Sequence, residues 1–175
     1  MQPTQYGQAQ LSVLPLRASA SHKSEMISQL LYNETYTILQ DEESWVLIEC
    51  LHDGYQWWLS KDQISYISEE IFDTPFQSYS TELLLWNNKI QHFIFMGSPF
   101  KQLTTAPQQD KASLIIRAAE QFINTPYLWG GRSPFGIDCS GLMQIIFRMA
   151  GILLPRDAYQ QAALGQNIRY GGHQK

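Results

Sequence analysis

Apolar side chains between residues 11 and 68 recur mainly at every second position, which is the period of a β-strand with one buried face. In the stretch that begins at Trp45, the residues Val46, Ile48 and Cys50 form one wholly apolar face. β-Branched and aromatic residues are common throughout this region. We expect short strands at residues 11–16, 26–31, 36–39, 45–50 and 55–59, and strands of this number and spacing predict an all-β small barrel.

A less regular segment follows the expected barrel. Residues 82–86 and 90–96 have strand character, and the Asn-rich stretch 87–89 between them is typical of a hairpin turn. An isolated hairpin is marginally stable, so this one must pack on a neighbour. Two interpretations are open: the remnant of a second small barrel, or a strand pair that braces the first. Residues 102–109 have the composition of a linker.

The last third of the chain changes to a helical period. Apolar residues at helical spacing predict a first helix that begins at the capping residue Asp110 and stops before Pro126; they are Leu114, Ile115, Ala118 and Phe122. A second helix is expected over residues 139–150, ending at Gly151, with one apolar face formed by Leu142, Ile145, Ile146 and Met149. A short third helix is expected at residues 158–164, with Asp157 as its cap and Gly165 as its stop.

Cys139 stands at the expected start of the second helix, after a glycine-rich approach that leaves its sulfur uncrowded. Free N–H groups and the positive end of the helix dipole favour a thiolate over a thiol at this position. The same N–H groups can stabilise an oxyanion on an acyl substrate. A single cysteine near a helix start can also be a small buried apolar residue. The flanking Asp138 and Ser140, together with the many glycines, favour the nucleophile.

Composition limits the other possibilities. The chain has 175 residues, 44% of them hydrophobic, and a net charge of −4. Without a basic stripe, nucleic acid is not an expected partner. No apolar run approaches the roughly 20 residues of a membrane span, and the first residues do not have the pattern of a secretory signal. We therefore expect a cytoplasmic protein with both cysteines reduced and Cys50 in the core.

The histidines and cysteines are too scattered to form a metal site, and we expect neither a metal nor a cofactor. We expect His22 and His52 in solvated loops and a structural role for His92.

The stretch from residue 127 to 141 reads Y-x-W-G-G-x-S-x-x-G-x-D-C-S-G, and it resembles the nucleophile segment of NlpC-type cell-wall cysteine peptidases over fifteen positions without a gap. The segments LPLRASASHKSEMISQLLYNETYTIL, WVLIEC and DGYQWWL resemble bacterial SH3-like domains. Together these resemblances imply an SH3-like small barrel at residues 8–70, a hairpin or degenerate second unit at 71–105, and an α+β papain-like peptidase domain at 106–175 of which mainly the helical half is present.

The family resemblance implies that Cys139 is the nucleophile and that its general base is a histidine on a later strand. His173 is the single histidine after Cys139, and its surroundings do not match that strand, so we do not assign it the role. Three interpretations are open: a fragment of a longer peptidase, a pseudoenzyme that binds cell-wall peptides, or an interaction module.

For a complete enzyme, the resemblance implies cleavage between γ-D-Glu and the diamino acid of stem peptides during murein recycling. The N–H of Cys139 and the phenol of Tyr127 are candidates for supporting the oxyanion. Asp138 and Ser140 are candidates for binding the peptide's amino end, with helix capping as an alternative role for Asp138. An amidase or acyltransferase is also compatible with the motif.

Two groups of side chains near these candidates are assigned less specific roles. We expect structural roles for Trp129 and Arg132. Tyr55, Trp57 and Tyr66 either pack within the barrel or form a wall that faces the ligand.

Overall fold

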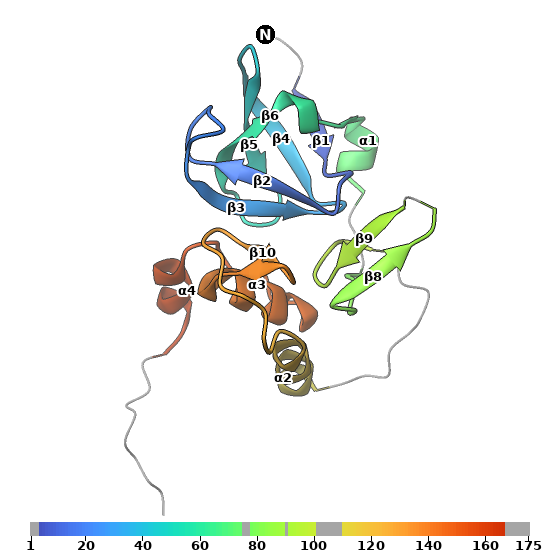
Figure 1. The fold of residues 1–175 in the computed structure, drawn as a ribbon, viewed down its shortest axis with the longest axis vertical. Helices are drawn as coiled ribbons and strands as arrows, with labels where there is room; N and C mark the ends of the chain where they lie inside the picture. Colours follow the sequence, from blue (N-terminus) through green and yellow to red (C-terminus); the bar gives the residue numbers. More distant parts are fainter. Residues whose placement is uncertain (1–3, 75–77, 90, 101–109, 167–175) are drawn as a thin grey trace, which may run out of the picture.

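The protein is described by a computed structural model that covers residues 4–74, 78–89, 91–100 and 110–166. A curled β-sheet forms one end of the molecule, and the helices α2, α3 and α4 form the other end (Figure 1). A separate hairpin lies beside the helices (Figure 1).

The described strands of the first part form one seven-stranded sheet in the order β3-β2-β6-β5-β4-β1-β7, in which all paired neighbours are antiparallel. The strands are β1 (Gln5–Gln8), β2 (Val13–Arg17), β3 (Met26–Leu31), β4 (Thr35–Asp41), β5 (Trp45–Cys50), β6 (Gln56–Ser60) and β7 (Tyr66–Ile67). The expected strands are confirmed as β2 to β6. The sequence prediction missed β1 and β7, which are only four and two residues long.

Tertiary contacts explain the position of β1. A Cβ atom on Gly7 would lie 2.3 Å from the ring of Tyr36, so the strand fits only because a glycine lets this buried aromatic side chain cross it. The pattern of residues 5–8 alone does not contain that information.

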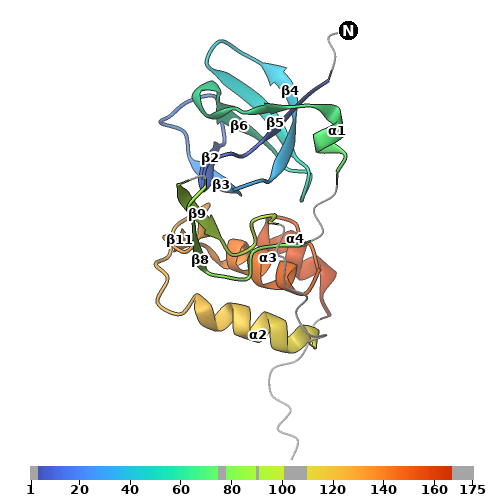
Figure 2. The same cartoon turned by 90° about the vertical axis from the view of Figure 1, so that its right-hand side faces the viewer.

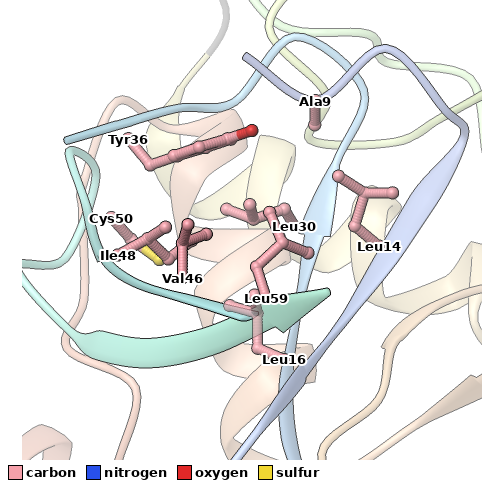
Figure 3. Packing of buried hydrophobic residues seen from close by; sticks show 9 residues of the cluster. All are labelled: Ala9, Leu14, Leu16, Leu30, Tyr36, Val46, Ile48, Cys50 and Leu59. Carbon is pink, nitrogen blue, oxygen red and sulfur yellow. The ribbon is translucent and has the colours of Figure 1, made fainter. Parts of the chain in front are cut away.

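The interior of the sheet is one apolar cluster, shown in Figure 3, to which β2 to β6 contribute. Leu30 comes from β3, at one end of the sheet order, and Tyr36 comes from β4, four places along it, so the sheet is curled around them. Cys50 is in this cluster, as expected, and burial raises the pKa of its thiol well above the ordinary value. These observations confirm the all-β first part.

Short helical segments and the hairpin connect the sheet to the rest of the chain. They are the single-turn helices η1 (Lys61–Gln63) and α1 (Glu69–Phe72) and the strands β8 (Leu84–Asn87) and β9 (His92–Phe95). Phe95 and Met96, at the end of the hairpin, are buried against Ile145 and Ala118 of the helices. The described part of this segment therefore packs on the helical half of the molecule.

The helical half contains α2 (Lys111–Gln121), α3 (Cys139–Met149) and α4 (Ala158–Leu164), together with a minimal hairpin of β10 (Arg132–Ser133) and β11 (Gly136–Ile137). Asp110 caps α2 by accepting a hydrogen bond from the N–H of Ser113. Gly151 takes the left-handed conformation, with φ of +73°, directly after α3. The expected helices and these two end signals are confirmed.

Helix α3 lies between the sheet and α2, as Figures 1 and 2 show from two directions. Its apolar face packs with Phe122 and with Leu31 of β3 in a second core cluster, so the two halves share buried contacts. Among the described helices, none has the length and apolar character needed to cross a bilayer.

Candidate active site

Cys139 is the first residue of α3, and it is exposed between two buried neighbours. Asp138 is 5% exposed and Ser140 is 7% exposed. The thiol therefore projects into solvent from the N-terminus of a helix whose apolar face is fixed in the core. This is the arrangement expected for a nucleophile, and a small buried apolar role for Cys139 is excluded.

The turn before α3 is held by the Asp138 carboxylate, which caps the helix. One oxygen accepts from the N–H of Gly141 at 2.7 Å and the other accepts from the N–H of Gly130 at 2.9 Å. Gly130 has φ of +76°, and a Cβ atom there would lie 2.5 Å from the Met26 carbonyl oxygen on β3. The glycine-rich approach thus lets the nucleophile loop lie directly on the sheet.

Arg156, in the loop between α3 and α4, closes the other side of this turn. Its guanidinium donates to both carboxylate oxygens of Asp138, at 3.1 and 2.6 Å, and to the Ser140 hydroxyl at 2.6 Å. Its Nε donates to the hydroxyl of Ser28, on β3, at 3.1 Å. Burial opposes the charge on Asp138, but the bonds from Arg156 and from the Gly141 N–H hold the pKa of its carboxyl below the ordinary value.

A groove of about 340 Å³ lies in front of Cys139. Both halves of the molecule line it: Ile27 and Trp57 come from the sheet, and Trp129, Asp138, Cys139, Ser140, Arg156, Asp157, Ala158 and Tyr159 come from the helical half. The groove thus combines aromatic side chains with charged side chains around the thiol. None of the described residues that line the groove is a histidine.

One contact between the two halves borders the groove. The Tyr55 hydroxyl donates to the Asp157 carboxylate, and the Tyr55 ring stacks on Trp57. Partial burial and the adjacent carboxylate both raise the pKa of Tyr55. Asp157 is the N-cap residue of α4, as expected, but its side chain makes no capping hydrogen bond. Trp57 lines the groove and also packs against the apolar cluster of the sheet, whereas Tyr66 is exposed on β7 and does not line the groove.

The other predicted residues are distributed as follows. Tyr127 is 67% exposed, pairs through its backbone with Ile137, and is not one of the residues that line the groove. Trp129 was expected to be structural, but it is 60% exposed and lines the groove, so that expectation is corrected. Arg132 is fully buried, in agreement with its expected structural role. His173 lies outside the described residues.

Arg132 belongs to a buried ionic cluster between the two halves. Glu34, in the turn after β3, accepts from Arg132 at 2.8 and 2.9 Å and from Arg148 of α3 at 2.5 Å. Burial raises the pKa of Glu34, but the charges of Arg132, His52 and Arg148 more than reverse this and lower it far below the ordinary value. His52 is not solvated as expected, because its side chain is 12% exposed and lies 3.1 Å from Asp53.

Sequence reasoning missed Arg156 and Asp157 as site residues because it interpreted them as the start of a helix. One signal was available: Arg156 directly follows an apolar stretch and Pro155, and a charge in such a position can be buried and paired. The sequence analysis also identified no partner for Glu34, because the two arginines that bind this carboxylate are 98 and 114 residues away in the chain. Within the described residues, no group of three or more potential ligands is arranged to hold a metal ion.

An SH3-like sheet and an exposed cysteine at the N-terminus of a buried helix define the class: a two-part chain whose helical half presents a thiol in a groove. The family comparisons agree with this. Residues 16–64 match the bacterial dipeptidyl-peptidase Sh3 domain, and residues 124–175 match the NlpC/P60 family. The chain therefore joins a bacterial SH3 domain to an NlpC/P60 segment, as the resemblance predicted.

Individual relatives support the same assignment. The chain is 48% identical over 61 residues to the gamma-D-glutamyl-L-lysine dipeptidyl-peptidase of Bacillus subtilis, a match that covers 35% of this chain and 21% of that protein. It is 24% identical over 190 residues to the Bacillus cereus protein of the same name, covering 83% of this chain and 56% of that protein. The chain thus spans well under two thirds of these relatives.

A solved structure extends the comparison to the whole fold. The structure of an NlpC/P60 family protein from Bacillus cereus superposes with a TM-score of 0.72 at 16% identity, covering 94% of this chain and 78% of that chain. Its similarity establishes the arrangement of the sheet and helices.

Proposed function

We propose that this chain carries the nucleophile of a cysteine peptidase that acts on peptides of the cell wall. The observation that supports this most directly is the exposed thiol of Cys139 at the N-terminus of α3, in a groove lined by both halves of the molecule. The relatives named as dipeptidyl-peptidases add support. The helical half is proposed to belong to an α+β papain-like domain.

The proposed reaction is acyl transfer through Cys139. The thiolate sulfur attacks the carbonyl carbon of an amide, the C–N bond breaks, and the amine leaves with a proton. Water then hydrolyses the thioester and restores the thiol. The N–H of Cys139, at the N-terminus of α3, is proposed to donate to the oxygen on which negative charge develops. Tyr127 remains a candidate for a second oxyanion donor.

A general base is required, and no described histidine lines the groove. This observation favours one alternative, in which the chain binds the peptide without cleaving it. The peptidase proposal predicts turnover of the peptide, whereas the binding proposal predicts none.

The groove also contains groups that suit a peptide's amino end. Asp138 and Ser140 flank the thiol, but Arg156 and backbone N–H groups already occupy the oxygens of Asp138. Asp157 is the other carboxylate that lines the groove, and its side chain accepts a hydrogen bond from Tyr55. We propose that Asp157 supplies the main carboxylate for the ammonium group, in a site that Asp138 and Ser140 border. Such a site selects peptides with a free amino terminus.

The finer proposal is cleavage between γ-D-Glu and the diamino acid of L-Ala-γ-D-Glu-diamino acid peptides, as a step of muropeptide recycling in the cytoplasm. Mass spectrometry of the products identifies the bond, because an amidase or an acyltransferase releases different fragments from the same peptide.

The first test compares turnover of an L-Ala-γ-D-Glu-diaminopimelate peptide by the protein and by Cys139→Ala. Turnover is expected to be lost in the variant, while the thermal unfolding midpoint stays within a few degrees because the side chain is exposed. Cys50→Ala is the matched control, since it removes a core thiol without touching the groove. Turnover that persists without Cys139 contradicts the mechanism, and tight peptide binding without turnover by the parent chain favours the binding alternative.

A further inference from the structure

Arg156 is a nearly fully buried cation directly behind the nucleophile, and the mechanism above gives it no chemical step. We propose that Arg156 is a positioning residue that fixes the Asp138-Cys139-Ser140 turn and neutralises the Asp138 carboxylate beside the thiol. The proposal rests on the proposed function insofar as Cys139 is the nucleophile. It concerns a side chain that the sequence motif around Cys139 does not contain.

The geometry shows a clamp on both sides of Cys139. Both terminal nitrogens of the guanidinium donate to the carboxylate of Asp138, the residue before the thiol. One of these two nitrogens also donates to the hydroxyl of Ser140, the residue after the thiol. The third nitrogen bonds Ser28 on β3. One side chain that is 4% exposed thus connects the cap of α3, its first turn and the sheet.

These bonds require a planar fork. An arginine can engage a carboxylate with two parallel N–H groups and still present Nε to a third partner, whereas a lysine ammonium is a single point charge. Arg156→Lys keeps the charge near Asp138 but cannot reach Ser140 and Ser28 in the same way. Arg156→Lys therefore tests the hydrogen-bonding geometry of Arg156 separately from its charge.

The charge role follows from the groups that face the thiol. Asp138 and Asp157 supply negative charge to the groove, the Tyr159 phenol lines it, and Arg156 is the positively charged side chain among the residues that line it. Without Arg156, the Asp138 carboxylate stays buried and uncompensated one residue from Cys139. A nearby negative charge disfavours formation of a thiolate.

Alkylation of Cys139 by iodoacetamide measures both effects and needs no general base. We would follow the modification by peptide mass spectrometry between pH 6 and pH 9, in the parent chain and in Arg156→Met. The variant is expected to label on the order of tenfold more slowly near pH 7 and to need a higher pH for its half-maximal rate. Arg156→Lys is expected to give an intermediate rate. Arg17→Met is the matched control, because Arg17 is on β2, donates to the Ser24 carbonyl in the turn before β3, and does not line the groove.

A double variant distinguishes compensation of the Asp138 charge from simple space filling. Asp138→Asn removes the unpaired charge from Arg156→Met while keeping a side-chain oxygen that can cap α3. The double variant is therefore expected to recover a labelling rate within about threefold of the parent, whereas loss of packing alone would leave it as slow as the single variant.

The possible results lead to different conclusions. Parent-like labelling of a folded Arg156→Met overturns the inference. If that variant does not fold, the double variant decides: parent-like labelling supports the inference, and slow labelling or failure to fold overturns it. Failure of the parent chain to label at Cys139 would instead refute the proposed nucleophile, so the two proposals can fail separately.

Discussion

At the scale of single residues, the nucleophile turn depends on how closely two stretches of backbone approach each other. Gly141 lies against the carbonyl of Gly131, and a Cβ atom there would be 2.4 Å from that oxygen and 3.0 Å from the Asp138 carboxylate. Backbone cannot move aside as a flexible side chain can. Any larger residue must therefore displace the cap of α3, and with it Cys139.

Gly141→Ala is accordingly expected to destabilise the protein by about 1–3 kcal/mol, the usual range for overpacking a tight site. It should also slow the labelling of Cys139. Urea unfolding together with iodoacetamide labelling tests both. Gly165→Ala is the control, because its Cβ atom would make ordinary contact at 3.7 Å. Equal stability of the two variants would show that the turn tolerates a side chain.

The sequence identifies residues whose role depends on local geometry and misses those whose role depends on distant partners. Cys139, the Asp138 cap and Gly151 follow from positions near helix ends, and the structure confirms each as a local feature. The local sequence around Arg156 and Glu34 does not identify the partners of these charges. Only the folded chain brings Glu34 to its two arginines and Arg156 to Ser28.

At the scale of elements, α3 connects the core to the site. Ile145 is fully buried, whereas Met143 on the same helix is 36% exposed. The helical period in the sequence predicts the buried face, because packing against one side selects apolar residues at that spacing. By contrast, β1 and β7 escape prediction, since such short strands are defined by their neighbours in the sheet.

Truncation of the buried face should therefore be much more costly than truncation of the exposed one. Ile145→Ala is expected to lower the free energy of unfolding by about 2–5 kcal/mol. Met143→Ala, on the same helix, is expected to lower it by less than about 1 kcal/mol. Chemical denaturation of both variants measures the difference. Similar losses would mean that α3 does not pack on the core as described.

At the scale of the whole molecule, the two halves are held together by a buried ionic cluster as well as by the apolar core. Glu34 belongs to the sheet, while Arg132 and Arg148 belong to the nucleophile loop and to α3. Asp53, in the loop before β6, accepts from Gln144 of α3 at 3.1 Å. Although burial acts in the other direction, the His52 charge and hydrogen bond and the Arg132 charge lower the pKa of Asp53 from 3.8 to about 2.

These lowered pKa values predict acid sensitivity. A carboxyl whose pKa is lower in the folded state stabilises the fold above its unfolded pKa, and that contribution is lost as the pH falls through the folded value. The melting temperature should therefore drop steeply between about pH 4 and pH 2, the window set by Asp53. Glu34 extends the effect toward lower pH.

Glu34→Gln tests the cluster at neutral pH. It leaves two buried arginines without their anion, and breaking such a cluster costs about 3–5 kcal/mol. Glu25→Gln, at an exposed position, should be neutral. Thermal unfolding at pH 7 compares them, and a neutral result at Glu34 would contradict the role of the cluster.

The central claim is that the fold of both halves presents Cys139 as an activated thiol. The most direct measurement is the iodoacetamide labelling rate of Cys139 and Cys50 at pH 7, in the native protein and in urea. The account predicts that native Cys139 labels faster than in the unfolded chain, because a helix N-terminus favours the thiolate. It also predicts that native Cys50 is protected by burial. Native labelling of Cys139 no faster than in urea would contradict the claim.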